Sequence, residues 1–155
     1  MSTVSLTPSS PCPCGRLDAR RRPLAWPDCC GRYLDAFDTQ PAPDAESLMR
    51  SRYSAYVLGR ADYLLATWHA STRPSELALD PGAEWLGLTV RGHWPAGARA
   101  EVEFLARYRQ EGRVQRLQER SRFVRETVRQ TLAGPDQAAP EQARWFYVDG
   151  DFKSR

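Results

Sequence analysis

Hydrophobic and polar positions change their period once along the chain, near residue 74. From Leu48 to Val57, apolar residues recur at the three- and four-residue spacing of an amphipathic helix. Asp44 precedes this run and can accept a hydrogen bond from the first turn, while Gly59 ends or kinks the helix. A second helix, with Asp62 as its N-cap, is expected to carry Tyr63, Leu64, Leu65 and Trp68.

Beyond Arg73-Pro74 the apolar residues alternate with polar ones, which is typical of strands exposed on one face. Strands are expected over 85–94, 101–108, 114–126 and 145–148, with a hairpin turn at 110–113, a loop over 133–143, and a stop at Asp149-Gly150. Helices followed by an antiparallel meander predict an α+β fold, in which the helices cover one face of a curved sheet.

The composition is that of a globular protein, with 41% hydrophobic and 26% charged residues and a net charge of +3. No run of 18 apolar residues is present, so no membrane span is expected, and the first eleven residues do not resemble a secretory signal. We therefore expect a cytoplasmic protein. The predicted organisation is a disordered N-terminus over 1–10, a small module over 11–37 and an α+β domain over 44–152.

All four cysteines lie in the small module, as the pairs Cys12/Cys14 and Cys29/Cys30. Two thiolate pairs separated by a loop suit the tetrahedral site of a structural zinc ion. Gly15 lets the backbone turn away after the first pair. Two disulfides, a redox pair and free thiols are the alternatives; a reducing compartment disfavours disulfides, and a redox pair usually has two residues between its cysteines. Zinc is the favoured prediction, with all four thiolates used and no position open for a substrate.

The motif Cys12-Pro13-Cys14-Gly15 followed by Cys29-Cys30-Gly31 resembles the SEC-C zinc motif, although the loop between its pairs is longer than usual. The remainder of the chain resembles the bacterial YchJ-like family, also called UPF0225. That likeness rests on the segments 48–56, 63–69, 119–123 and 145–150. The resemblance implies an NTF2-like cone, with helices in the concavity of a bent sheet. It also implies a zinc module of a kind that contacts the export and translation machinery.

A cone of this kind often holds a pocket, and polar residues are expected on its inner face. On the strand 114–126, Glu119 and Ser121 share a face with apolar neighbours, and a buried carboxylate needs a partner. The candidate pocket residues are Tyr53, Trp68, His69, Glu119, Ser121, Arg50 and Arg52. A ligand site or a Glu119–His69 acid/base pair is one interpretation. The other, favoured here, is a buried salt bridge that fixes how helix and sheet dock.

Arginines dominate the basic residues, and several lie on the opposite face of the same strand as Arg116, Arg120 and Arg122. Such a strip can hold phosphates, yet no aromatic residues are expected on that face to stack with bases. Cross-strand pairing with Glu101 and Glu103 on a solvated face is favoured over nucleic-acid binding.

The leading functional prediction is a non-enzymatic adaptor whose zinc module docks a protein partner. A small-molecule-binding protein or enzyme that uses the cone is the alternative, and weak nucleic-acid or ribosome association comes third.

Overall fold

The computed structural model describes residues 6–129 and 141–153 of the 155-residue chain. In chain order its elements are the 3-10 helix η1 (Trp26–Asp28), the helices α1 (Gly31–Asp35), α2 (Ala45–Leu58) and α3 (Ala61–Ala66), and the strands β1 (Glu84–Ala96), β2 (Arg99–Gln110), β3 (Arg113–Arg129) and β4 (Glu141–Phe152). In the segment predicted to be disordered, residues 6–10 include a turn closed by Ser10 N–H donating to Thr7 O, at 3.0 Å. Residues 1–5 lie outside the described part.

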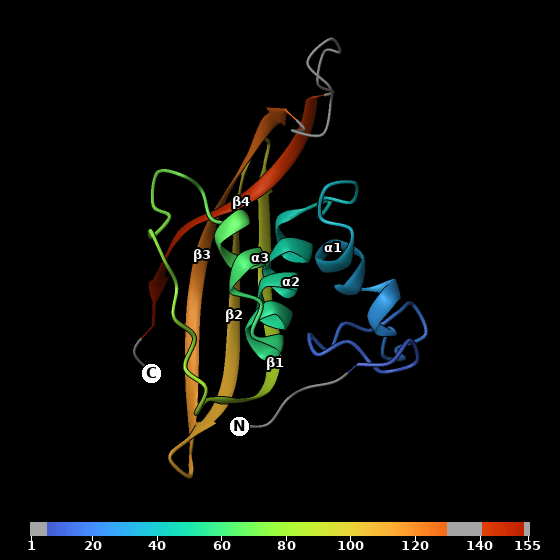
Figure 1. The fold of residues 1–155 in the computed structure, drawn as a ribbon, viewed down its shortest axis with the longest axis vertical. Coiled ribbons are helices and arrows are strands. Elements are labelled where there is room, and N and C mark those ends of the chain that lie inside the picture. Colours follow the sequence, from blue (N-terminus) through green and yellow to red (C-terminus); the bar gives the residue numbers. More distant parts are fainter. Residues whose placement is uncertain (1–5, 130–140, 154–155) are drawn as a thin grey trace.

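The strands form one antiparallel meander in the order β1-β2-β3-β4, and the α-helices lie on one face of it (Figure 1). The module that contains the cysteines sits beside α2, on the β1 side of the sheet (Figure 1). The predicted α+β architecture, with helices covering one face of a sheet, is confirmed. No helix in the described part of the chain is long and apolar enough to cross a membrane.

Helix α2 has the ends that its sequence predicts. The Asp44 carboxylate accepts a hydrogen bond from Ser47 N–H at 2.7 Å, and Gly59 ends the helix in the left-handed region at φ 72°. The predicted N-cap of α3 is wrong, because Arg60 occupies that position and Asp62 lies inside the first turn, paired with the Arg60 guanidinium at 3.0 Å. A carboxylate there still favours the helix through the helix dipole.

Strand β4 continues past the predicted stop at Asp149-Gly150 and reaches Phe152. It continues because both residues stay in register with β3, Asp149 opposite Arg122 and Gly150 opposite Ser121. Of the predicted loop, residues 141–143 belong to β4, and residues 133–140 lie outside the described part. The predicted hairpin is confirmed: Glu111 and Gly112 both take positive φ, which a two-residue turn between twisted strands requires.

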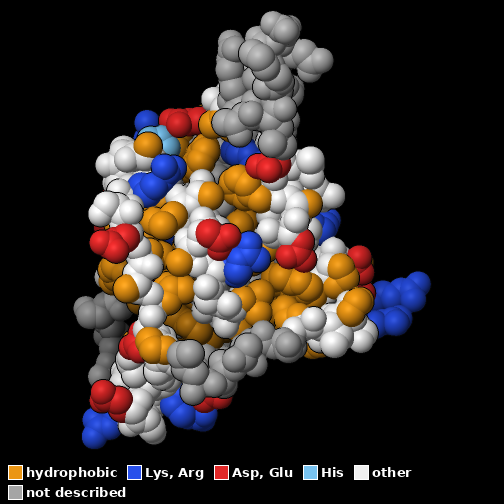
Figure 2. Space-filling view, in the orientation of Figure 1, with side chains coloured by type: hydrophobic (Ala, Val, Ile, Leu, Met, Phe, Trp, Pro, Cys, Tyr) orange, Lys and Arg blue, Asp and Glu red, His pale blue; other side chains and the backbone are white. Residues whose placement is uncertain are grey.

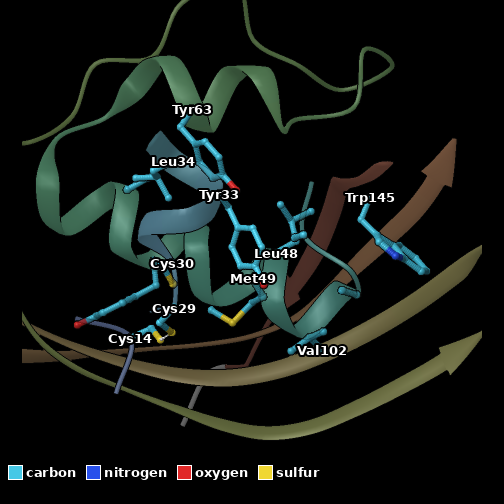
Figure 3. Close-up of a cluster of buried hydrophobic side chains, with 14 of the residues drawn as sticks. Cys14, Cys29, Cys30, Tyr33, Leu34, Leu48, Met49, Tyr63, Val102 and Trp145 are labelled. Carbon is cyan, nitrogen blue, oxygen red and sulfur yellow. Dashed lines mark hydrogen bonds between the residues drawn. The ribbon is translucent and has the colours of Figure 1, made fainter. Parts of the chain in front are cut away.

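One hydrophobic core joins the cysteine module to the α+β domain. The buried thiols belong to the same cluster as apolar side chains of α1, α2 and the sheet. Figure 3 draws Cys14, Cys29 and Cys30 in one buried cluster with Tyr33, Met49 and Val102. The module therefore packs as part of the domain core rather than as a detached appendage.

Candidate metal centre and ligand cavity

The backbone of the module brings the two cysteine pairs together through short-range hydrogen bonds. Cys12 N–H donates to Leu24 O at 2.9 Å, which closes the loop between the pairs. Gly15 then turns the chain at φ 75°, as its position after the first pair predicts. Cys29 ends η1, and Cys30 is the N-cap of α1, so the second pair lies at a junction of two helical turns.

A tryptophan that the sequence reasoning missed fixes this junction. A Cβ added to Gly31 would fall 2.6 Å from Trp26 O and 2.9 Å from Trp26 Cε2, because the indole packs directly over that glycine. Trp26 is buried, and no motif around it signalled this role. The helical turn after Cys30 therefore depends on the absence of a side chain at residue 31.

The four sulfur atoms have the spacing of metal ligands. All lie within 4.8 Å of one another, and Cys14 Sγ is 3.6 Å from both Cys12 Sγ and Cys29 Sγ. Thiolates about 2.3 Å from one ion at tetrahedral angles would lie about 3.8 Å apart, whereas a disulfide needs about 2.05 Å. The four cysteines are free and buried, so the cluster could hold a metal ion.

The protonation of these thiols is interdependent. Hydrogen bonding from the neighbouring thiols, first of all Cys14, lowers the pKa of Cys12, while hydrogen bonds with Cys12 and its neighbours raise the pKa of the deeply buried Cys30. Four thiolates in contact would repel one another unless a cation lay between them. The arrangement therefore suits a cation better than four separate thiols.

Helix α2 holds the cysteine cluster against the domain. Arg50 donates to Cys14 O at 3.2 Å and pairs with Glu46 at 2.8 Å, and Ser54 Oγ lies 3.6 Å from Cys12 Sγ. Arg50 was predicted among the pocket residues, and the structure places it against the module instead. The reason is its position on α2, where it points toward the cysteines while Arg52 and Tyr53 point toward the sheet.

A cavity of about 250 Å³ opens between α2 and the concave face of the sheet. Its lining residues come from α2, the segment after α3 and all four strands: Met49, Arg52, Tyr53, Tyr56, Trp68, Trp85, Phe104, Ala106, Leu117, Glu119, Ser121, Phe123, Tyr147 and Phe152. The α2 members Met49, Arg52/Tyr53 and Tyr56 recur once per helical turn, and those of β3 alternate, as the periods of helix and strand require. Phe152 is 66% exposed, so the cavity reaches the surface at the end of β4.

Arg52 is a buried cation held between two aromatic rings. Its Cζ lies 5.1 Å from the ring centre of Trp68 and 4.6 Å from that of Tyr147. Its Nη1 donates to Leu64 O at 2.8 Å and to Thr67 Oγ1 at 2.7 Å. Desolvation lowers the pKa of Arg52 from its ordinary value. The hydrogen bonds to these neutral groups therefore fix the orientation of the guanidinium in the wall of the cavity.

Glu119 is the buried anion of the same cavity, only 5% exposed. Its Oε2 accepts hydrogen bonds from Ser121 Oγ at 2.6 Å and from the Tyr147 hydroxyl at 2.9 Å. Burial, together with this carboxylate, raises the pKa of Tyr147 above its ordinary value, which keeps the hydroxyl a donor. The carboxylate packs over Gly150, whose missing side chain leaves the space that Glu119 fills.

One of the candidate partners of Glu119, His69, does not contact it. His69 lies outside the cavity, where its ring is 2.9 Å from Glu126 Oε2 and 2.7 Å from Ser71 Oγ. Of the predicted pocket residues, Tyr53, Trp68, Glu119, Ser121 and Arg52 line the cavity together. Trp68 Nε1 is buried and, among the described residues, has no hydrogen-bond partner.

Sequence reasoning missed Tyr147, Tyr56 and Trp85 as cavity residues. Tyr56 follows Arg52 and Tyr53 at helical spacing, a signal that was available in the sequence. Tyr147 faces the helices because β4 is shifted by one residue against β3 between Arg122 and Phe123, and no sequence pattern reveals that irregularity.

The comparisons with known proteins agree with this geometry. The family model described as the YchJ middle NTF2-like domain matches residues 44–150. A UPF0225 protein of Polaromonas sp. is 56% identical, over 96% of this chain and 97% of its own length. A UPF0225 protein of Bordetella pertussis is 50% identical, over 94% of this chain and 97% of its own.

Two solved structures are similar over 94% of this chain, each at 30% identity and a TM-score of 0.69. One is the crystal structure of a SEC-C motif containing protein from Psychrobacter arcticus, of which 84% is covered. The other is the solution structure of a SEC-C motif containing protein from Rhodopseudomonas palustris, which is covered completely, at 100%. Both likenesses extend across the cysteine module as well as the cone.

Proposed function

The chain belongs to the UPF0225 family of YchJ-like proteins, and we propose that it is a binding protein that takes a small molecule into the cavity of its NTF2-like cone. The observation that carries this proposal is a cavity of about 250 Å³ whose wall holds both a buried arginine and a buried glutamate. Concave, mostly apolar sites with a few fixed polar groups are where proteins bind small ligands.

A purely structural salt bridge accounts less well for these two residues. Among the described residues, no carboxylate lies within 4.0 Å of the Arg52 guanidinium, and Glu119 forms no ion pair either. Burying two charges without pairing them directly costs free energy. A pair kept for docking helix against sheet would be expected to close, whereas this pair is held apart by Tyr147.

A cavity-filling variant tests this proposal. Ala106 is buried on β2 and lines the cavity, so Ala106→Phe should fill it without adding charge. Both proteins are screened by thermal unfolding against a library of small metabolites. A ligand at 100 times its dissociation constant stabilises the folded state by about 2.7 kcal/mol. Compounds that stabilise the unmodified protein should have no effect on the variant; equal effects on both proteins, or no active compound, would count against the cavity.

We propose zinc as the metal of the cysteine cluster, in a structural role. Four sulfur ligands at tetrahedral spacing favour zinc or an iron site over hard cations, and zinc is the common ion of structural sites built from four cysteines. A reducing cytoplasm, the proposed location, would keep the thiols available. Elemental analysis of the protein purified without added metal tests this assignment: about one zinc per chain is expected, and iron in its place would refute it.

A second candidate function is the docking of a protein partner by the module. The loop between the ligand pairs folds back on itself through the bridges Leu17–Pro23 and Pro11–Ala25. This places Leu17, 50% exposed, beside the exposed Arg20, Arg21 and Arg22. Figure 2 shows basic side chains gathered at the tip of the module, which favours an acidic partner surface.

This docking function is best tested away from the cysteines, because they belong to the domain core. Replacing Leu17 with Ser and Arg20 and Arg22 with Ala should abolish capture of a partner from lysate while leaving the melting temperature unchanged. Replacing Arg109 and Arg113, in the distant β2–β3 hairpin, with Ala is the matched control for lost charge. Retention of all partners by the loop variant would refute the docking function.

Nucleic-acid binding ranks below both functions. Two of the three outer-face arginines are paired with acidic side chains: Arg120 with Glu101 at 2.6 Å, and Arg122 with Asp149 at 2.5 Å and Asp151 at 2.8 Å. The expectation that this face lacks an aromatic residue is wrong, because Trp94 lies there with Arg120 Cζ 4.1 Å from its ring centre. That guanidinium covers one face of the Trp94 ring, which is 45% exposed, so the arginine competes with any base for that face.

A further inference from the structure

The cavity of the cone carries opposite charges at two fixed places. Arg52 on α2 is held by Leu64 O and Thr67 Oγ1, and Glu119 on β3 is held by Ser121 and Tyr147. All four of these partners are neutral, so neither charge is cancelled by a direct neighbour. A molecule that fills the cavity therefore meets a strong donor at one place and a strong acceptor at another.

Each charged group keeps polar atoms that are free to form hydrogen bonds with a ligand. Both hydrogen bonds of Arg52 use Nη1, and in the described part of the chain no partner is found for Nε or Nη2. Both hydrogen bonds of Glu119 are accepted by Oε2, so Oε1 remains as an acceptor. Tyr147 lies between the two groups, since its ring covers Arg52 and its hydroxyl donates to Glu119. The Tyr147 side chain therefore separates the two charged groups.

The aromatic side chains that line the rest of the cavity favour a flat ligand of limited size. Aromatic rings stand edge to face around the space, with Tyr53 and Trp85 at 5.8 Å and 81°, and Phe123 and Tyr147 at 5.8 Å and 67°. An apolar cavity of about 150 Å³ accepts benzene. A cavity of about 250 Å³ accordingly has room for one ring with a polar substituent.

We infer that this cavity takes an uncharged, single-ring aromatic molecule with an amide-like group, whose N–H donates to Glu119 and whose carbonyl accepts from Arg52. The inference rests on the proposed ligand-binding function. An anionic ligand would be attracted by Arg52 but repelled by Glu119. A cationic ligand would be attracted by Glu119 but repelled by Arg52. A plain hydrocarbon would leave both charged groups buried without a new partner. Of these four classes, a neutral donor–acceptor group is the one that satisfies both.

Four probes with the same ring and different substituents test the ligand class. Benzamide is neutral with a donor and an acceptor, benzoate is an anion, benzylamine is a cation, and toluene is apolar. Each is titrated into the full-length, metal-containing protein while the Trp68 indole N–H signal is followed by NMR, with Trp68→Phe used to assign it. Benzamide is expected to bind with a dissociation constant at least tenfold below those of the other three.

The variant Glu119→Gln tests the role of the carboxylate. Removing the negative charge leaves Arg52 unopposed, so this variant should lose its preference for benzamide and bind benzoate at least tenfold more tightly than the unmodified protein does. Glu126→Gln is the matched control, because Glu126 is half-exposed and pairs with His69 outside the cavity. The control should leave all four dissociation constants unchanged. Should Glu119→Gln fail to fold, the probe series on the unmodified protein still decides the ligand class.

The outcomes separate this inference from the function on which it rests. If benzoate or benzylamine binds the unmodified protein more tightly than benzamide, or toluene binds equally well, the cavity binds ligands but the neutral donor–acceptor class is wrong. If none of the four probes shifts the Trp68 signal up to its solubility limit, and no metabolite stabilises the protein in the thermal screen, the ligand-binding function is refuted as well. If Glu119→Gln gains no affinity for benzoate, Glu119 does not set the charge preference.

Discussion

Replacing Gly150 with Ala is expected to destabilise the wall of the cavity, because the new methyl group would collide with Glu119. A Cβ at this position would lie 2.7 Å from Glu119 Cδ and 2.8 Å from Glu119 Cγ. Carbon atoms in contact prefer about 3.5–4.0 Å. The Glu119 side chain cannot move aside freely, because it is buried and accepts hydrogen bonds from both Ser121 and Tyr147. Gly150 does not take positive φ, so the cost is steric rather than conformational.

The expected fall in the free energy of unfolding is about 2–4 kcal/mol. Overpacking accounts for about 1–3 kcal/mol, and the weakening of one hydrogen bond accounts for about 1 kcal/mol. Urea unfolding followed by tryptophan fluorescence measures it. Gly87→Ala on β1 is the control, since its Cβ would approach only the flexible end of Arg107, at 3.2 Å. That variant should change the stability by less than about 1 kcal/mol.

A double-mutant cycle tests whether the collision with Glu119 is the cause. In the Glu119→Ala background the colliding atoms are gone, so Gly150→Ala should cost little, which gives a coupling energy of about 2–4 kcal/mol. An equal cost in both backgrounds would refute the steric argument. The same conclusion would follow if Gly150→Ala were no more costly than Gly87→Ala.

Three further predictions concern the metal centre, the buried cation and the tyrosines. Removing the metal with a chelator should lower the melting temperature of the whole chain in one calorimetric transition, because the cysteines share a core with α2; an unchanged main transition would contradict this. Arg52→Lys should destabilise the protein by about 1–3 kcal/mol in urea, because a lysine lacks the planar guanidinium that contacts both rings and its compact ammonium is more strongly hydrated, whereas Arg109→Lys on the surface should cost less than about 0.5 kcal/mol. Burial raises the pKa of Tyr53 to about 12 and also raises the pKa of Tyr63 and Tyr147, so the unfolded chain loses these protons first. The stabilisation from these three tyrosines is therefore fully present below about pH 10 and falls as the pH rises from about 10 to 12; urea midpoints that stay constant over this alkaline range would contradict the assignment.

The fold was largely predictable, because its signals are local. Asp44 and Gly59 mark the ends of α2, and Gly112 marks the β2–β3 turn, through backbone preferences that act within a few residues. The continuation of β4 through Asp149 and Gly150 was not predictable. It depends on pairing with β3, and tertiary pairing overrides the turn preference of such a dipeptide.

Helix α2 shows why the candidate sites could be predicted only in part. Its sequence indicates one apolar face, yet Ser47, Ser51 and Ser54 are also buried. They are buried because the module covers one side of the helix and the sheet covers the other. Ser51 satisfies its hydroxyl with Leu48 O and with the Tyr63 hydroxyl, both at 2.7 Å. The spacing of apolar residues does not reveal that a helix is enclosed on several sides when small polar residues such as serine form some of its buried contacts.

The sequence by itself determined the order of the elements, the inward face of β3 with Glu119 and Ser121, and the four cysteines that could bind a metal ion. These features follow from spacing and turn chemistry, which operate over short stretches of chain. Only the tertiary structure decided that Arg52 and Glu119 line one cavity without touching, and that Arg50 and His69 lie elsewhere. Those placements depend on how α2 crosses the sheet and on the shifted register of β4, since contacts between residues far apart in the chain leave no periodic trace in the sequence.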